Sequence, residues 1–377
     1  SVDPPRADSA AHRTARRGNI VAANLHFRPM SAPALAGLAI PTELLPVQEM
    51  VGLSLRRVEA CFDRALRSDL PPVENLVRHI ETYRGKMLRP ALVILSGLAA
   101  RATPTAELGL DAAVSDAHIT IAAVCEMIHM ATLVHDDVLD EADIRRKGAT
   151  VNRLRGNETA VILGDYLFSS AYHLCSTLDS QSAALLIGHT GMTLCAGELL
   201  QLHHRENLSI DQPTYFEIVR RKTGSLISIA CRLGAMQSSP DAALATRFAD
   251  FGMCVGVAFQ IQDDLLDLTG NQTIVGKPLR RDLELGKLTL PVIHHLETAD
   301  PLSRGRTLAL LQDTDTFDAR AARELVDRLN STRSLAFAAA KAAELVNQAK
   351  HLLAPIPDSP AKRLLLVMAD QVVARAS

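Results

Sequence analysis

The segment HMATLVHDDVLD, residues 129–140, ends a long apolar stretch with an acidic cluster. The same pattern returns in MCVGVAFQIQDDLLD, residues 253–267. Each cluster has three aspartates at equal spacing: Asp136, Asp137 and Asp140, then Asp263, Asp264 and Asp267. Carboxylates four residues apart share one helical face, and unpaired carboxylates beside apolar surface are costly. Because Mg²⁺ keeps substrate phosphate as a ligand beside one or two carboxylates, two facing clusters predict a site for a metal-bound diphosphate.

The composition favours a large helical protein. The 377 residues carry a formal net charge of −2, 47% are hydrophobic, only 3% are aromatic, and Trp is absent. This balance gives no support for a nucleic-acid partner or a polybasic membrane arm. No apolar run reaches the roughly 18 residues of a membrane span, since Glu126 and His129 interrupt the best candidate. Six scattered cysteines without a C-x-x-C pair indicate small core residues of a reduced, cytoplasmic protein: Cys61, Cys125, Cys175, Cys195, Cys231 and Cys254.

Two parts are expected along the chain. Residues 1–45 mix Arg with Pro and lack helical periodicity, which predicts a mobile tail. The tail is also Arg-rich and acid-poor, as transit peptides are, so organellar targeting remains open. Residues 46–377 show apolar residues at helical spacing in segment after segment. We therefore predict an all-α fold, a large single-domain bundle of antiparallel helices around a central cavity.

Several basic residues are candidates for anion binding. Lys86 and Arg89 lie between Gly85, which allows close backbone approach, and Pro90, which can start a helix. An anion-binding site and an ordinary basic loop are equally good interpretations of this stretch. Lys222-Thr223 precedes Gly224 between two predicted helices, where a cation and a Gly also suit a plain helix end. Other basic candidates follow the two clusters: Arg145, Arg146, Lys277 and Lys287. The glycines near Lys277 do not have P-loop spacing.

Glu126-x-x-His129 has the spacing of a di-iron carboxylate bundle. Such a site needs a second Glu-x-x-His, and the sequence does not contain one at a sensible position. A buried, hydrogen-bonded His129, or one that contacts a phosphate, is the favoured interpretation.

Together these motifs resemble the trans-isoprenyl diphosphate synthases, or polyprenyl synthetases, over roughly residues 46–377. The likeness rests on Gly85-Lys86-x-x-Arg89-Pro90, His129 before the first cluster, Arg145-Arg146, Gly164-Asp165, Lys222-Thr223, Gln260 before the second cluster, Gly276-Lys277, Asp282 and Gly286-Lys287. The resemblance implies an all-helical enzyme, usually a homodimer. It would extend an allylic diphosphate with isopentenyl diphosphate, head to tail and in trans geometry.

The resemblance also implies residue roles. Asp136, Asp140 and Asp263 would hold Mg²⁺, three ions with substrate bound, and Asp137, Asp264 and Asp267 would support them. Arg145, Lys222 and Lys277 would contact the allylic diphosphate. The diphosphate of isopentenyl diphosphate would be held by Lys86, Arg89, His129 and Arg146. Thr223 and Gln260 would steady the allylic cation, so that Lys222, Thr223, Gln260 and Arg145 serve catalysis. One departure is visible: the family often has Gly-Gly-Lys-Arg where this chain has Arg84-Gly85-Lys86-Met87.

Product length is expected to depend on residues one to three turns before Asp136. These predicted wall residues are Val124, Cys125, Ile128, Ala131 and Thr132. Since none is aromatic, we expect a product of C20 or longer, and a Phe at Ala131 or Ile128 should shorten it.

Three other functions were weighed. A terpene cyclase normally lacks the second full cluster and the Lys86–Arg89 site. A regulatory, weakly active subunit of a heteromeric prenyl synthase typically loses aspartates, whereas all six are present here. An iron-handling bundle needs the missing second Glu-x-x-His. An apolar product also suggests transient membrane contact during its release.

Overall fold

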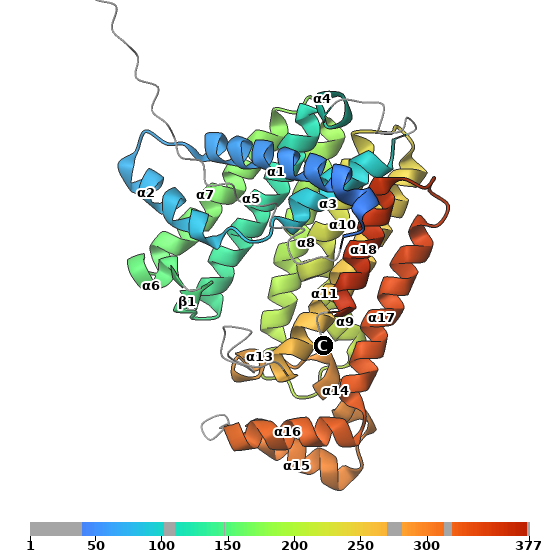
Figure 1. The fold of residues 1–377 in the computed structure, drawn as a ribbon. Coiled ribbons are helices and arrows are strands. Elements are labelled where there is room, and N and C mark those ends of the chain that lie inside the picture. The colour runs from blue at the N-terminus through green and yellow to red at the C-terminus, as the bar shows by residue number, and fades with distance from the viewer. Residues whose placement is uncertain (1–39, 102–109, 147, 270–280, 313–318, 375–377) are drawn as a thin grey trace, which may run out of the picture. The chain divides into compact units, whose positions relative to one another are not determined.

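The computed structural model describes residues 40–101, 110–146, 148–269, 281–312 and 319–374. Within these ranges the chain is a bundle of helices, which confirms the predicted all-α class (Figure 1). The described strands are two residues long: β1 (Ile144–Arg145) pairs antiparallel with β2 (Gly148–Ala149), and Ile144 lies opposite Ala149.

The helices follow one another with short connections. The N-terminal half contains η2 (Thr42–Leu44), α1 (Leu45–Leu66), α2 (Pro71–Ile80), η3 (Glu81–Tyr83), α3 (Leu88–Ala99), α4 (Leu110–Ala113), α5 (Asp116–Leu139), α6 (Val151–Arg155), α7 (Asn157–Ser176) and α8 (Gln181–His203). The C-terminal half contains α9 (Gln212–Val219), η5 (Arg220–Gly224), α10 (Ser225–Met236), α11 (Ala242–Thr269), α13 (Arg281–Glu284), α14 (Leu290–Thr298), α15 (Pro301–Gln312), α16 (Ala319–Ser331), α17 (Ser334–Leu353) and α18 (Pro360–Ala374). Helical structure thus begins at Thr42, inside the last residues assigned to the tail, whose residues 1–39 lie outside the described part.

Local sequence explains several helix starts. Asp211 caps α9, because its carboxylate accepts a hydrogen bond from the Thr214 N–H at 2.9 Å. Ser180 caps α8 in the same way through the Ala183 N–H at 3.3 Å. Pro71 occupies the first turn of α2, where a missing N–H costs little.

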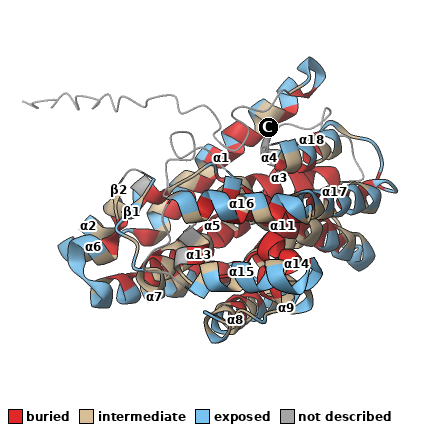
Figure 2. Cartoon of the chain, turned by 90° about the horizontal axis from the view of Figure 1, so that it is seen from below, coloured by how far each residue is buried: buried red, intermediate tan, exposed pale blue. Residues whose placement is uncertain are grey.

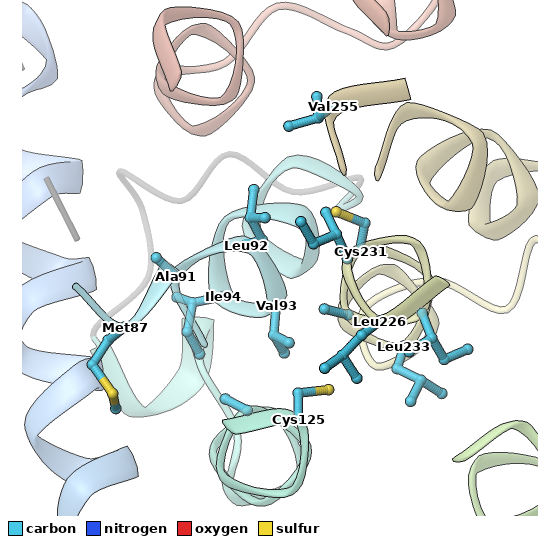
Figure 3. Packing of buried hydrophobic residues seen from close by; sticks show 14 of the residues in the cluster. Met87, Ala91, Leu92, Val93, Ile94, Cys125, Leu226, Cys231, Leu233 and Val255 are labelled. Atoms are coloured by element: carbon cyan, nitrogen blue, oxygen red, sulfur yellow. The ribbon is translucent and has the colours of Figure 1, made fainter. Parts of the chain in front are cut away.

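The core forms where α5, α10 and α11 pack against α3, α7 and α17. Figure 3 shows Leu92 and Val93 of α3 beside Leu226 and Cys231 of α10. Burying such a side chain contributes about 1.5–3 kcal/mol for a Leu or Val. Figure 2 shows buried residues along α5 and α11, whereas α15 and α16 present many exposed ones. The two helices that carry the acidic clusters are therefore fixed by the core.

The expectation that no apolar run is long enough for a membrane span was too strict. Three described helices are long and apolar enough to cross a membrane by length and composition alone: α5, α8 and α11. A single charged residue does not exclude a helix as a candidate span, because the rest of its 18-residue window is strongly apolar. Most of the apolar window of α5 is buried inside the bundle, whereas only a third of that of α8 is.

Candidate active site

The two acidic clusters face one cavity. Asp136, Asp140, Asp263, Asp264 and Asp267 all line a cavity of about 450 Å³. A second cavity of about 1130 Å³ adjoins it, since Leu133, Asp136, Lys222, Thr223, Gln260 and Asp263 line both. The central expectation, two acidic helices that share a hollow, therefore agrees with the structure.

Cations surround the first cluster. The Lys287 ammonium lies 2.8 Å from Asp140 Oδ1, and the Arg205 guanidinium lies 3.6 Å from the same oxygen. Lys222 Nζ lies 3.8 Å from Asp136 Oδ1. Burial raises the pKa of Asp136 to about 6, although Lys222 opposes this shift. Arg205 had no motif to reveal it, because it lies far from both clusters in sequence.

Asp137 has different surroundings from Asp136. It is buried and lines neither cavity, because a residue next to Asp136 points about 100° around the helix from it. Its Oδ1 accepts hydrogen bonds from Arg145 at 2.8 and 2.7 Å. Asp137 therefore holds Arg145 in place at the edge of the smaller cavity, which Arg145 itself lines.

Neutral donors contact Asp264 of the second cluster. The Tyr215 hydroxyl donates to Oδ2 at 2.6 Å, and Gln260 Nε2 donates to Oδ1 at 2.8 Å. Burial raises the pKa of Asp264 well above its usual value, with Asp282 adding to the shift. Thr223 donates to Gln260 Oε1 at 2.9 Å. A hydrogen-bonded chain therefore joins η5, α11 and α9.

Lys222 and Thr223 lie on an irregular turn. The five residues Arg220–Gly224 form one π-helical turn between α9 and α10, a feature often found at functional sites. Lys222 Nζ lies 2.5 Å from Glu198 Oε2 and 2.9 Å from Gln201 Oε1, both on α8. The turn thus presents Lys222 and Thr223 to the cavity and fixes the lysine beside Asp136.

The opposite side of the larger cavity is cationic. Lys86, Arg89, His129 and Arg146 line it together with Glu126. Arg146 Nη1 donates to the Tyr83 carbonyl at 2.5 Å, and a Cβ at Gly85 would collide with its guanidinium. Burial, reinforced by Arg89 and Arg146, lowers the pKa of His129 well below its usual value, so the ring is neutral. A dianionic phosphate group fits this pocket.

The departure at residues 84–87 has a structural explanation. Met87 takes a left-handed conformation (φ 54°) before α3, and its buried apolar side chain belongs to the core cluster and also lines the larger cavity, where the family often has an Arg. Arg84 lines the cavity, but it forms an ion pair with Asp63 and lies over the Phe62 ring at 4.5 Å. Its charge is therefore already neutralised on α1.

The five predicted wall residues differ in their surroundings. Thr132 lines the larger cavity, whereas Val124, Cys125, Ile128 and Ala131 line neither of the two cavities described above and are completely buried. They lie on the part of α5 that packs into the core, and Figure 3 shows Cys125 among residues of α3 and α10. Leu133, Val138 and Leu139 of α5 do line the larger cavity, and further apolar lining comes from α7 and α8, through Val161, Phe168, Leu194, Cys195 and Leu199. Cys195 is exposed, unlike the core cysteine that the sequence suggested.

The carboxylates fit Mg²⁺ by their chemistry. Five hard oxygen donors share one cavity, and Mg²⁺ is usually completed by waters and substrate phosphates. Among the described residues, no three His, Cys, Asp or Glu side chains converge as a ready-made metal cage. Phosphate oxygens would therefore have to supply further ligands. Lys277 lies outside the described residues.

Known proteins share this sequence and this arrangement of helices. The family model for polyprenyl synthetase matches residues 71–329. A nonaprenyl diphosphate synthase from Mycobacterium tuberculosis is 35% identical over 91% of this chain and 98% of its own length. A short chain isoprenyl diphosphate synthase from Methanothermobacter thermautotrophicus is 33% identical over 85% and 97%. A Caulobacter crescentus polyprenyl synthase, complexed with calcium and isoprenyl diphosphate, superposes with a TM-score of 0.77 at 28% identity, covering 89% of this chain and 97% of that one.

Proposed function

The chain belongs to the polyprenyl synthetase family, and on that premise we propose that this prenyltransferase condenses an allylic diphosphate with isopentenyl diphosphate, head to tail and in trans geometry, to a product of C20 or longer. One observation carries the proposal. Aspartates of both clusters line the smaller cavity, and Lys86, Arg89 and Arg146 line the adjoining larger one, which gives each of two diphosphates its own place.

The residues divide the two substrates between them. We assign the allylic diphosphate to the acidic side, where Lys222 and Lys287 supply positive charge beside Asp136 and Asp140. Isopentenyl diphosphate would bind Lys86, Arg89 and Arg146, with neutral His129 as a hydrogen-bond donor. Opposite polarity at the two sides favours one orientation for each substrate.

Charge separation is the difficult step, and the site is built to support it. Mg²⁺ bound at the aspartates would neutralise the departing diphosphate. Lys222 would stabilise the same developing negative charge. Oxygens of Thr223 and Gln260 would face the allylic cation that remains. The isopentenyl double bond would attack this cation, and the new cation would lose a proton to the departed diphosphate, which restores a double bond in the product. Apolar side chains such as Phe168 and Leu194 would keep water from trapping it.

A second copy would complete the wall. Leu185, Met192 and Leu199 recur at helical spacing on α8 and are 63%, 72% and 67% exposed. Val161 and Ile162 expose further apolar surface on the adjoining α7. Exposed apolar patches mark interfaces, and Val161 and Leu199 also line the larger cavity. We therefore propose a homodimer through α7 and α8, in which the partner shields the cavity.

Light scattering after size-exclusion chromatography would test the dimer. Met192→Glu should yield monomers, whereas Leu302→Glu, a change at an exposed leucine on α15, should leave the mass unchanged. If the Met192→Glu protein remained dimeric, α8 would not be part of the interface.

The wall also suggests which residue limits product length. Phe168 is the aromatic side chain that α7 contributes to the larger cavity, and it stacks on His135 with ring centroids 6.1 Å apart. Phe168→Ala should therefore lengthen the product, while Tyr172→Ala, one turn further along α7 and outside the cavity lining, should not. Equal product lengths in both variants would contradict this assignment.

The decisive assay uses the purified chain with farnesyl diphosphate and labelled isopentenyl diphosphate. We expect lengthened allylic products in Mg²⁺ and none after EDTA, with chromatography to report their length. Absence of any condensation product with farnesyl, geranyl or geranylgeranyl diphosphate would overturn the proposal.

A further inference from the structure

The hydrogen-bonded chain behind Gln260 contains two residues to which the mechanism above gives no part. Tyr215 on α9 and Asp264 on α11 are each only 4% exposed. Asp264 uses one oxygen for the Tyr215 hydroxyl at 2.6 Å and the other for Gln260 Nε2 at 2.8 Å. Both carboxylate oxygens of Asp264 thus have hydrogen-bond donors.

These contacts fix which end of the Gln260 amide meets the cavity. The Thr223 hydroxyl on the other side of the amide could donate to an oxygen or accept from an NH₂ group, so it does not select an orientation. The Asp264 oxygen facing the amide accepts its hydrogen bond from Gln260 Nε2, so this contact places the NH₂ end of the amide on the side of Asp264. The amide oxygen is left on the side of Thr223, 2.9 Å away, and both residues line the two cavities.

We propose that Asp264 and Tyr215 are positioning residues, which orient the Gln260 amide so that its oxygen, the negative end of its dipole, faces the cavity where the allylic cation forms. Asp264 acts here through Gln260 and not as a metal ligand. Neighbouring Asp263 points about 100° away around the helix and lines both cavities. A flipped amide would present its positive end to the cation and slow ionisation. The inference rests on the proposed function, because it concerns the charge that this reaction develops.

Tyr215→Phe is the sharpest variant, since it keeps the ring and removes only the hydroxyl. We expect kcat to fall about 10- to 100-fold, while the KM values of both substrates and the Mg²⁺ concentration for half-maximal rate remain unchanged. Asp264→Asn offers an NH₂ group as well as an oxygen, so it should lower kcat in the same way. Tyr166→Phe is the matched control on α7, whose hydroxyl donates to the Leu66 carbonyl at 3.5 Å, and it should behave like the parent.

A conservative rescue and a binding measurement separate positioning from other roles. Gln260→Glu presents an oxygen in either orientation, so Asp264→Asn with Gln260→Glu should recover part of the kcat that Asp264→Asn loses. The thermal shift produced by Mg²⁺ with inorganic diphosphate should be the same in the parent, Tyr215→Phe and Asp264→Asn.

Two results would overturn the inference. One is a Tyr215→Phe protein with the parental kcat. The other is an Asp264→Asn protein whose Mg²⁺ requirement rises and whose thermal shift disappears, as expected for a lost metal ligand. Both leave the proposed function standing, which depends instead on whether the parent protein forms product.

Discussion

The two aspartate clusters have the same spacing but different surroundings. In the first, Asp136, Asp137 and Asp140 contact cations from four separate elements or loops, namely Lys222, Arg145, Arg205 and Lys287. In the second, the middle residue Asp264 contacts the neutral donors Tyr215 and Gln260. Equal spacing on two helices therefore does not mean equal roles.

The difference shows that the role of each aspartate depends on the side of its helix on which it lies. Asp136 and Asp263 line both cavities and can serve the diphosphate, whereas their neighbours Asp137 and Asp264 are buried and are hydrogen-bonded by protein side chains. Asp137 meets this need with Arg145, and Asp264 meets it with Tyr215 and Gln260. The following changes test that division, from the largest expected effect to the smallest.

Asp136→Ala should abolish condensation, because it removes a cavity-facing carboxylate from the diphosphate site. We expect kcat/KM to fall by more than about 10³-fold, with an unchanged far-ultraviolet circular dichroism spectrum. Incorporation of labelled isopentenyl diphosphate measures the loss. Turnover near the parental rate would mean that the first cluster does not serve the diphosphate.

Asp137→Ala should act mainly on stability. It leaves the Arg145 guanidinium without its buried partner, which costs on the order of 3–5 kcal/mol in the free energy of unfolding. Urea unfolding measures this loss, and Asp136→Ala, expected within about 1 kcal/mol of the parent, is the control. Equal stability of both variants would erase the distinction between the two positions.

Lys287→Ala should weaken binding of the allylic substrate. The variant lacks the ammonium that lies beside Asp140 and would also contact the diphosphate. A charge-assisted hydrogen bond to the diphosphate contributes roughly 1.5–3 kcal/mol, which corresponds to about 10- to 100-fold in KM. Lys341→Ala, at an exposed pair on α17, serves as the control in the same steady-state kinetics. A KM equal to that of the parent would show that Lys287 only balances the charge of Asp140.

The thermal stability of the metal-free protein should also depend on pH through the titration of Asp136. Its folded-state pKa of about 6 lies above the usual 3.8, so its protonated form is favoured on folding and this contribution is lost as pH rises through about 6. In EDTA, the Tm of the parent should therefore fall by roughly 2 °C more than the Tm of Asp136→Asn between about pH 5 and about pH 7.5. Identical losses in the two proteins would show that Asp136 does not titrate in this range.

Most of the architecture was predictable from local pattern. The apolar spacing along residues 46–377 predicted a helical bundle, and the structure has long helices there, such as Ala242–Thr269. Matching spacing also identified the two aspartate clusters, whereas the roles of Lys86, Arg89 and Lys222 were implied by the family resemblance. These features follow from helical periodicity and from the cost of leaving charges unpaired.

The wall could not be predicted in the same way. Residues on α5 were chosen because they precede Asp136 on one helix, yet Ile128 and Ala131 turned out to pack into the core. A helix has several buried faces, and only its neighbours decide which face meets a cavity. The sequence of α5 contains no record of where α7 and α8 lie, so Phe168 and Leu194 were missed.

The sequence by itself determined that the chain is a helical bundle with two acidic helix faces and a basic pocket, because periodicity and charge are written residue by residue. Gln260 lies four residues before Asp264 on the same helix, so their contact follows from local periodicity. Tertiary structure alone brought Tyr215 of α9 to Asp264, and Lys222, Arg205 and Lys287 to the first cluster, because contacts between separate elements depend on packing geometry that no single stretch encodes.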